Sequence, residues 1–125
     1  MPDKHKILVV DDDPIIRSLL RHLLEKAGYQ VLMAVDGVQA TMMARTAKPH
    51  CIVLDIMMPA GDGFAVLERI HQMIGTMSIP VIIHSSLSQA DIMKRIQAGP
   101  GTPILQKPAA AELILETIKT AIEEG

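Results

Sequence analysis

Short apolar runs alternate with stretches of helical periodicity five times along this chain of 125 residues. The runs that we predict as strands are 7–10, 31–35, 51–54, 81–83 and 104–106, and a predicted helix follows each one. Uninterrupted apolar runs are typical of strands buried on both faces, which form parallel sheets covered by helices. Right-handed crossovers then favour a doubly wound α/β sandwich, because five units are too few to close a barrel of eight.

The predicted helices begin and end at residues that suit those positions. Asp13 and Pro14 provide an N-cap followed by a proline in the first turn, and Gly28 suits the position just after the last turn. The other helices are predicted over about 38–47, along the apolar face 64–74, over 88–96 and over about 109–123. Because these units leave no linker or low-complexity tract, we expect one domain over residues 1–125.

The composition excludes several classes of function. Aromatic residues make up 2% of the chain and the net charge is −2, so there are neither stacking platforms nor a basic surface for nucleic acids. The single cysteine, Cys51, allows no intramolecular disulfide and no Cys-rich zinc site. The first apolar run is too short for a signal peptide or a membrane span, so we expect a soluble, cytoplasmic protein without membrane contact.

Polar residues follow four of the five predicted strands at the point where each strand ends. Asp11 and Asp12 follow the first strand, Asp55 the third, Ser85 the fourth and Lys107 the fifth. Ligands of doubly wound sheets bind outside the carboxyl ends of the strands, so we expect these side chains to meet at one edge. Each residue alone is a common turn or cap residue, and it is their joint occurrence that predicts a site.

This set of side chains suits phosphoryl chemistry. Three carboxylates against one lysine raise a carboxylate pKa or recruit a cation, and hard oxygen ligands with open positions suit Mg²⁺ or Mn²⁺. An aspartate can itself be the nucleophile in phosphoryl transfer. A metal, an ammonium group and a hydroxyl would then offset the charge on the phosphoryl oxygens.

Five short motifs occur in order along the chain, between Lys6 and about Glu123. They are the runs 7–13 (ILVVDDD), 53–59 (VLDIMMP), 62–63 (DG), 80–85 (PVIIHS) and 107–108 (KP). Together they resemble the receiver domain of two-component response regulators, in its single-domain, chemotaxis-regulator-like form. The resemblance implies a flavodoxin-like (βα)5 fold with strand order 2-1-3-4-5, and a cis bond before Pro108.

The resemblance also implies roles for the acidic residues. Asp55 is expected to accept a phosphoryl group from a sensor histidine kinase or a phosphotransfer protein. Asp12 and Asp55 are expected to bind the metal directly and Asp11 through water, with the backbone carbonyl of Met57 completing the protein ligands.

The remaining implied roles concern the phosphorylated state. The Ser85 hydroxyl and the Lys107 ammonium are expected to bind phosphoryl oxygens. The function expected from the resemblance is a phosphoacceptor switch that alters a protein-interaction face made of the fourth helix, fifth strand and fifth helix. Such a switch catalyses its own phosphorylation and dephosphorylation and acts on no outside metabolite.

The sequence departs from the usual pattern of this family at a few positions. Ile104 stands where the family often has an aromatic residue that reports phosphorylation, which makes the usual coupling to a partner doubtful. His84 stands where an apolar residue is usual. Met57 and Leu87 are apolar at positions that tune water access, so we expect slow loss of the phosphoryl group if they shield it.

Two other functions stay open on the residues alone. Asp11 and Asp13 superficially fit the Asp-x-Asp of small phosphatases of the haloacid dehalogenase kind, although Ile15 stands where that class usually has Thr or Val. A degenerate receiver used as a docking module would fit Ile104. The intact set of acids, hydroxyl and lysine argues against that second alternative.

Overall fold

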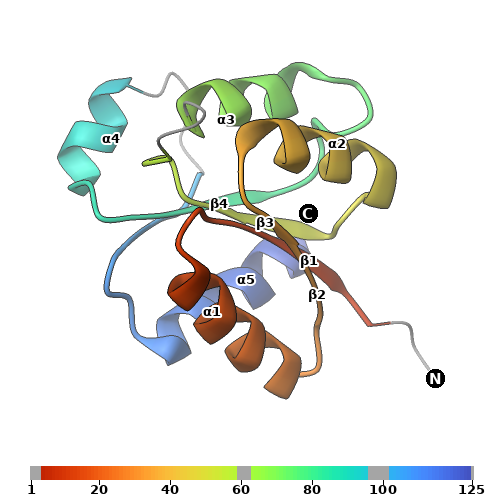
Figure 1. Cartoon of the computed structure of the whole chain (residues 1–125), viewed down its shortest axis with the longest axis vertical. Helices are drawn as coiled ribbons and strands as arrows, with labels where there is room; N and C mark the ends of the chain where they lie inside the picture. The colour runs from red at the N-terminus through yellow and green to blue at the C-terminus, as the bar shows by residue number, and fades with distance from the viewer. Residues whose placement is uncertain (1–3, 59–62, 96–101, 125) are drawn as a thin grey trace.

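A computed structural model describes residues 4–58, 63–95 and 102–124, which form one parallel five-stranded sheet with helices on both faces (Figure 1). The strands are β1 (Lys6–Val10), β2 (Gln30–Ala34), β3 (Cys51–Leu54), β4 (Val81–Ser85) and β5 (Ile104–Gln106). The helices are α1 (Pro14–Lys26), α2 (Gly37–Ala47), α3 (Gly63–Gln72), α4 (Gln89–Arg95) and α5 (Ala111–Glu124). The strand order is β2-β1-β3-β4-β5, which confirms the predicted fold class.

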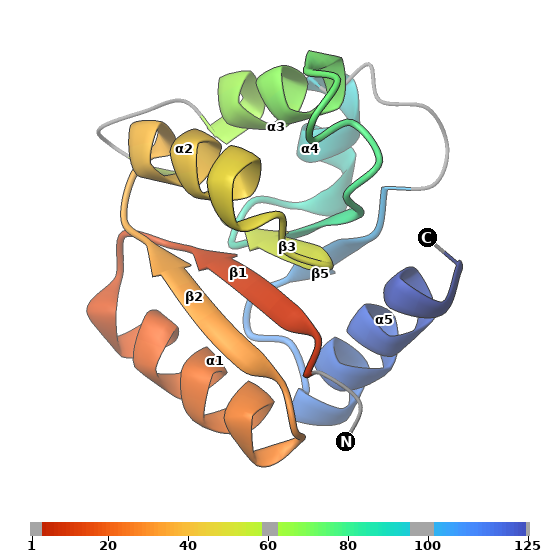
Figure 2. The ribbon, with the colours of Figure 1, turned by 90° about the vertical axis from the view of Figure 1, so that its right-hand side faces the viewer.

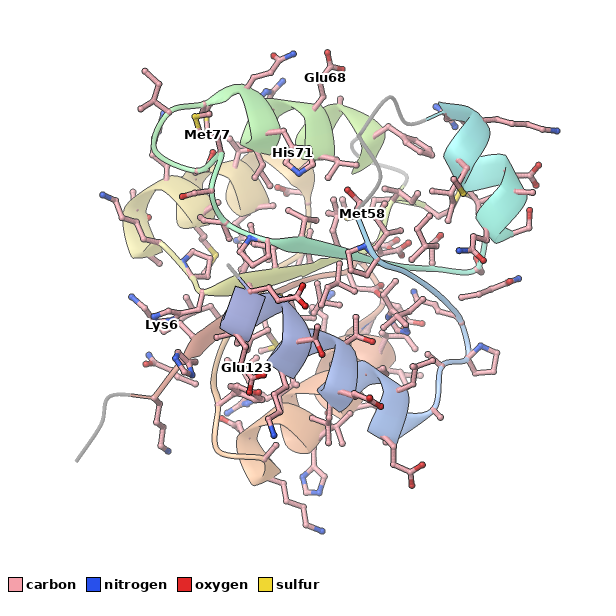
Figure 3. All side chains as sticks on the ribbon, turned by 180° about the vertical axis from the view of Figure 1, so that it is seen from behind. Lys6, Met58, Glu68, His71, Met77 and Glu123 are labelled. Carbon is pink, nitrogen blue, oxygen red and sulfur yellow. The ribbon has the colours of Figure 1, made fainter. Side chains whose placement is uncertain are left out.

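Two apolar layers lie on opposite faces of this sheet. Helices α2, α3 and α4 cover one face, and α1 and α5 cover the other (Figure 2). Side chains alternate along each strand, so Leu8 joins the first layer while its neighbour Val9 joins the second. Figure 3 shows both layers, with His71 and Met77 on the α3 side and Glu123 on α5. Each fully buried Leu or Ile contributes roughly 1.5–3 kcal/mol to folding.

Side-chain caps begin the first two helices. The Oδ1 atom of Asp13 accepts the Ile15 N–H at 2.9 Å, and the Oδ1 atom of Asp36 accepts the Gln39 N–H at 2.8 Å. These bonds satisfy N–H groups that have no partner inside the helix. Gly28, just beyond the end of α1, has φ +98°, a conformation that glycine adopts without strain. The predicted boundaries of α1 are thereby confirmed.

Three apolar residues in or near the helices are exposed, among them Ile74, which falls in the predicted apolar face 64–74. Helix α3 ends at Gln72, so Ile74 lies in the following turn and is 91% exposed. Thr76 stabilises that turn, because its hydroxyl donates to the Ile70 carbonyl at 2.7 Å. Leu19 on α1 and Leu113 on α5 are also half exposed or more. The predicted end of α4 at Ile96 lies outside the described residues.

Cys51 is fully buried in the layer under α1 and α5, as expected for a small core residue. Burial raises the pKa of its thiol to about 12. The thiol therefore stays protonated at neutral pH, and the side chain serves packing.

Candidate functional site

The carboxyl ends of four neighbouring strands, β1, β3, β4 and β5, form the edge where the predicted site residues lie. Backbone hydrogen bonds continue past the strand ends and fix this edge. The Asp55 N–H donates to the Val10 carbonyl at 2.9 Å, and the Lys107 N–H donates to the Ser85 carbonyl at 2.7 Å. Strand pairing thus places residues that lie far apart in the sequence next to one another.

Lys107 joins the ends of three strands through its side chain. Its Nζ atom lies 2.8 Å from Asp11 Oδ2 and 3.2 Å from Asp55 Oδ2. Asp11 and Asp55 are 1% and 4% exposed, so these ion pairs are poorly screened by water. The Lys107–Pro108 bond is cis, as the resemblance implied.

The second oxygen of each buried carboxylate is held by a backbone N–H group. Asp11 Oδ1 accepts from Asp13 and Asp55 Oδ1 accepts from Met57, both at 2.9 Å. Each bond spans two residues, the local turn that aspartate side chains favour. Both carboxylates are therefore oriented before any ligand arrives.

Burial and neighbouring charges act in opposite directions on the groups of this site. Burial raises the pKa of Asp55, against the Met57 N–H and the charge of Lys107, and the charge of Asp11 raises it further. Burial alone would lower the pKa of Lys107, but its hydrogen bond to Asp11 and the charge of Asp55 raise it overall. Lys107 is cationic at neutral pH, and its single positive charge does not fully compensate the negative charges of Asp11 and Asp55.

The geometry fits a divalent cation. Ligand atoms of Asp11, Asp12 and Asp55 all lie within 4.8 Å of one another, and Asp12 is exposed to solvent. Three carboxylates facing one ammonium group leave excess negative charge, and hard oxygen donors on a partly open edge suit Mg²⁺ with its retained waters.

Ser85 and Met57 flank the acidic cluster. Ser85 is fully buried at the end of β4, and its hydroxyl oxygen accepts the Leu87 N–H at 3.3 Å. The Met57 side chain is 50% exposed, next to the loop that carries Asp55. Asp13, in contrast, is occupied with capping α1. Of the predicted motif residues, Pro59 and Asp62 lie outside the described part of the chain.

Gly63 allows the start of α3 to pack directly against the backbone that carries Asp55. A Cβ atom at this position would lie 2.2 Å from the Ile56 Cα and 2.9 Å from the Asp55 carbonyl oxygen. Helix α3 therefore begins in direct contact with the backbone that carries Asp55, and any other residue would displace that backbone.

Arg17 is a site neighbour that the sequence analysis did not identify. Its Nη1 atom donates to the Asp11 carbonyl at 2.8 Å, which ties the first turn of α1 to the acidic loop. The sequence does contain a signal for this role, because Arg17 is the first basic residue after three aspartates and falls in the first turn of the helix.

Comparison with known proteins places this geometry in a family. The model of the response regulator receiver domain matches residues 7–119. The chain is 34% identical over 117 residues to protein PilH of Pseudomonas aeruginosa, covering 94% of this chain and 97% of PilH. It is 37% identical over 118 residues to the DNA-binding dual master transcriptional regulator RpaA of Synechocystis, covering 94% of this chain but only 48% of RpaA.

A solved structure adds a metal to the comparison. The receiver domain of the sensor histidine kinase PA1611 from Pseudomonas aeruginosa has a magnesium ion coordinated in its active-site cleft. It aligns with a TM-score of 0.87 at 25% identity, over 97% of this chain and 99% of that one. The family match argues against the alternative that the chain is a phosphatase of the haloacid dehalogenase kind. The chain belongs to the receiver domains of two-component response regulators, which are phosphoacceptor switches.

Proposed function

We propose that Asp55 is the phosphoacceptor, in a magnesium-dependent reaction with a phosphohistidine of a sensor histidine kinase or phosphotransfer protein. One observation supports this above the others. The buried Asp55 carboxylate contacts Lys107 at 3.2 Å and lies beside two further carboxylates at the carboxyl edge of the sheet.

The proposed transfer is a substitution at phosphorus. A carboxylate oxygen of Asp55 forms a bond to the phosphorus atom as the P–N bond to the donor imidazole breaks. The donor nitrogen keeps the bonding electron pair and takes up a proton from solvent. The product is an acyl phosphate on the protein and a free histidine on the donor.

The metal ligands in this proposal are the three acids and one backbone group. Asp12 and Asp55 would bind Mg²⁺ directly, Asp11 through water, and the Met57 backbone carbonyl would complete the set. When bound, the metal supplies positive charge that offsets the oxygens of the transferring group. Mn²⁺ has similar ligand preferences and is expected to substitute.

Lys107 and Ser85 act on the phosphoryl group itself in this proposal. The Lys107 ammonium already contacts an Asp55 oxygen, so it lies within reach of a phosphoryl group on that carboxylate. The Ser85 hydroxyl, at the end of the neighbouring strand, would donate to a second phosphoryl oxygen.

Phosphorylation by a small donor tests the proposal. The protein is incubated with Mg²⁺ and acetyl phosphate, and intact mass spectrometry measures the gain of one phosphoryl group. We expect the gain to disappear with EDTA and in Asp55→Asn. Asp13→Asn is the matched control, because asparagine caps a helix as well as aspartate does and the gain should persist. A gain that survives Asp55→Asn would refute the assignment.

We further propose that the domain removes its own phosphoryl group slowly, because the exposed Met57 side chain limits water access. Met57→Asn should then dephosphorylate several-fold faster, as followed by mass spectrometry after donor removal. Met77→Asn, with a similarly exposed methionine in the turn after α3, is the control. Equal rates for Met57→Asn and the wild type would contradict the shielding role.

The output face is proposed to be α4, β5 and α5. Ile104 and Leu87 each pack against the apolar layer under α2, α3 and α4, so an aliphatic side chain occupies the place of the family's aromatic residue. We expect amide NMR shifts on adding beryllofluoride to concentrate in these three elements. Shifts confined to the acidic edge would instead support a docking module without a switched face.

We propose a cytoplasmic location, in keeping with the family, and a single receiver domain over residues 1–125. Among the helices of the described ranges, none has the length and apolar character needed to cross a bilayer. The chain spans about half the length of RpaA, and the DNA binding in that protein's name is said of RpaA alone.

A further inference from the structure

A cavity of about 470 Å³ lies between α1 and α5, on the face of the sheet opposite α2, α3 and α4. Figure 2 shows these two helices side by side below the sheet. Most of its wall is aliphatic and includes Leu19, Leu20, Leu23 and Ile114. A volume between roughly 300 and 1,000 Å³ with an apolar wall and a few polar groups is typical of small-molecule sites.

His84 lines this cavity and has an unsatisfied polar atom. The side chain is 5% exposed, and its Nδ1 atom is buried without a hydrogen-bond partner. A buried polar atom without a partner is costly, so a turn of the imidazole that brings Nδ1 to the cavity wall would be favoured by a hydroxyl group bound there. Burial keeps the imidazole neutral by lowering its pKa, and a hydroxyl can pair with either nitrogen form.

The charges around the cavity have one sign. Its titratable lining residues are His22, Lys26, His84 and Lys107, and none of the described lining residues carries a carboxylate. Lys107 is committed to Asp11 and Asp55, but the ion pairs among the described residues do not involve Lys26. The exposed Lys26 ammonium is therefore available to an anion at the end of α1.

The cavity follows α1 for most of the helix length. Lining residues run from Ile16 to Lys26, which corresponds to about 15 Å along the helix axis. A cationic group thus stands at one end of an aliphatic wall. His84 also forms part of the wall, and its unsatisfied Nδ1 atom is buried beneath the surface.

We propose that this cavity binds a small amphipathic carboxylate. Its carboxylate pairs with Lys26, its chain packs on the aliphatic wall, and a hydroxyl group on that chain bonds to His84. The cavity shares Lys107 with the acidic cluster as part of its wall, but the proposed contacts to the ligand involve neither Lys107 nor a carboxylate of that cluster.

Binding is tested on the unphosphorylated protein without Mg²⁺, so its failure and a failure of the phosphoacceptor assignment are distinguishable. The probes are octanoate, 8-hydroxyoctanoate and 1-octanol, measured by saturation-transfer NMR and amide shift titration. We expect octanoate to bind with a dissociation constant on the order of 1 mM. The hydroxyl should improve affinity about fivefold, and octanol should bind more weakly than octanoate.

Three variants locate the probe in the cavity. Leu19→Gln should weaken octanoate binding about fivefold and Lys26→Gln roughly threefold, whereas Leu113→Gln and Lys119→Gln on α5 are matched controls that line no part of it. His84→Leu should remove the advantage of the hydroxyl while leaving octanoate binding intact. Circular dichroism melts confirm that each variant is folded.

Two results would overturn the proposal. One is the absence of octanoate binding to the wild type, which would leave the cavity for a protein partner. The other is binding that Leu19→Gln and Lys26→Gln leave unchanged, which would place the probe elsewhere on the surface.

Discussion

The two faces of the sheet are packed differently. On the face of α2 and α3 two contacts are so close that glycine is required. A Cβ atom at Gly37 of α2 would lie 2.7 Å from the Val66 side chain of α3, and one at Gly63 of α3 would meet the Ile56 backbone after β3. Under α1 and α5 the packing leaves the cavity of about 470 Å³. The tightly packed face fixes the backbone of Asp55, while the other face has room for a ligand.

Truncating matched isoleucines on the two faces should give the largest difference. Ile70 of α3 is fully buried, and Ile114 of α5 is nearly so but borders the cavity. Ile70→Ala should cost about 4 kcal/mol because it leaves a closed void, and Ile114→Ala about 2 kcal/mol because it widens an open one. Urea unfolding measures both, and equal losses would contradict the contrast between the faces.

Gly63→Ala should have the next largest effect. The new methyl group must displace the backbone at Ile56, which should cost about 3 kcal/mol and slow phosphorylation of Asp55. Gly75→Ala is the control, because a Cβ atom there meets no neighbour within 4 Å. Thermal melts and the acetyl phosphate assay measure the two effects, and a Gly63→Ala protein with unchanged stability would disprove the close approach.

Enlarging alanines should produce effects of opposite sign on the two faces. Ala40 of α2 is fully buried in the tight layer, so Ala40→Leu should cost about 2 kcal/mol by overpacking. Ala109 lines the cavity, so Ala109→Leu should stabilise the protein by about 0.5 kcal/mol and block octanoate. Denaturant midpoints give the comparison. Losses of similar size in both variants would mean that the cavity cannot accept a side chain.

The smallest effect on stability is expected at Asp55, which follows β3 at the carboxyl edge of the sheet, between the two helical layers. Because its pKa is raised in the folded protein, its charge costs stability at neutral pH, and Asp55→Asn should melt higher than the wild type without Mg²⁺. The folded state takes up this proton at a higher pH than the unfolded state, so the difference should shrink as the pH falls towards the ordinary carboxyl value of 3.8 and be lost below it. Calorimetry across that range measures it.

Added Mg²⁺ should reverse the order of the melting temperatures of the wild type and Asp55→Asn. Ligand binding stabilises the folded state, and the wild type offers the full set of acids, so added Mg²⁺ should raise its melting temperature more than that of Asp55→Asn. Asp36→Asn, a cap residue away from the site, is the control for charge alone. Identical responses of all three proteins would argue against a metal at the acidic cluster.

Much of the fold and site follows from local sequence signals. The third and fifth strands match their predicted bounds, and Asp13 caps α1 as predicted. The meeting of Asp11, Asp55 and Lys107 follows from counting strand ends, because parallel strands bring their carboxyl ends to one edge. The individual chemical roles of these residues remain predictions.

The features that were missed depend on distances between elements. Ile74 fits helical periodicity, but the turn stabilised by Thr76 ends the helix first. The support of Asp55 by Gly63 depends on how closely α3 approaches β3, and the cavity depends on the spacing of α1 and α5. No local pattern encodes such spacings, although His84 departed from the family pattern in the sequence itself.

The burial of Cys51 has a practical consequence for studying the switch. The thiol is fully buried and its pKa is raised to about 12, so it presents little thiolate at pH 7 and should react only slowly with maleimide reagents. A cysteine introduced at the exposed Met93 of α4 or Leu113 of α5 would then carry the sole label. Fluorophores or spin labels can therefore be attached to the proposed output face without first removing a native thiol.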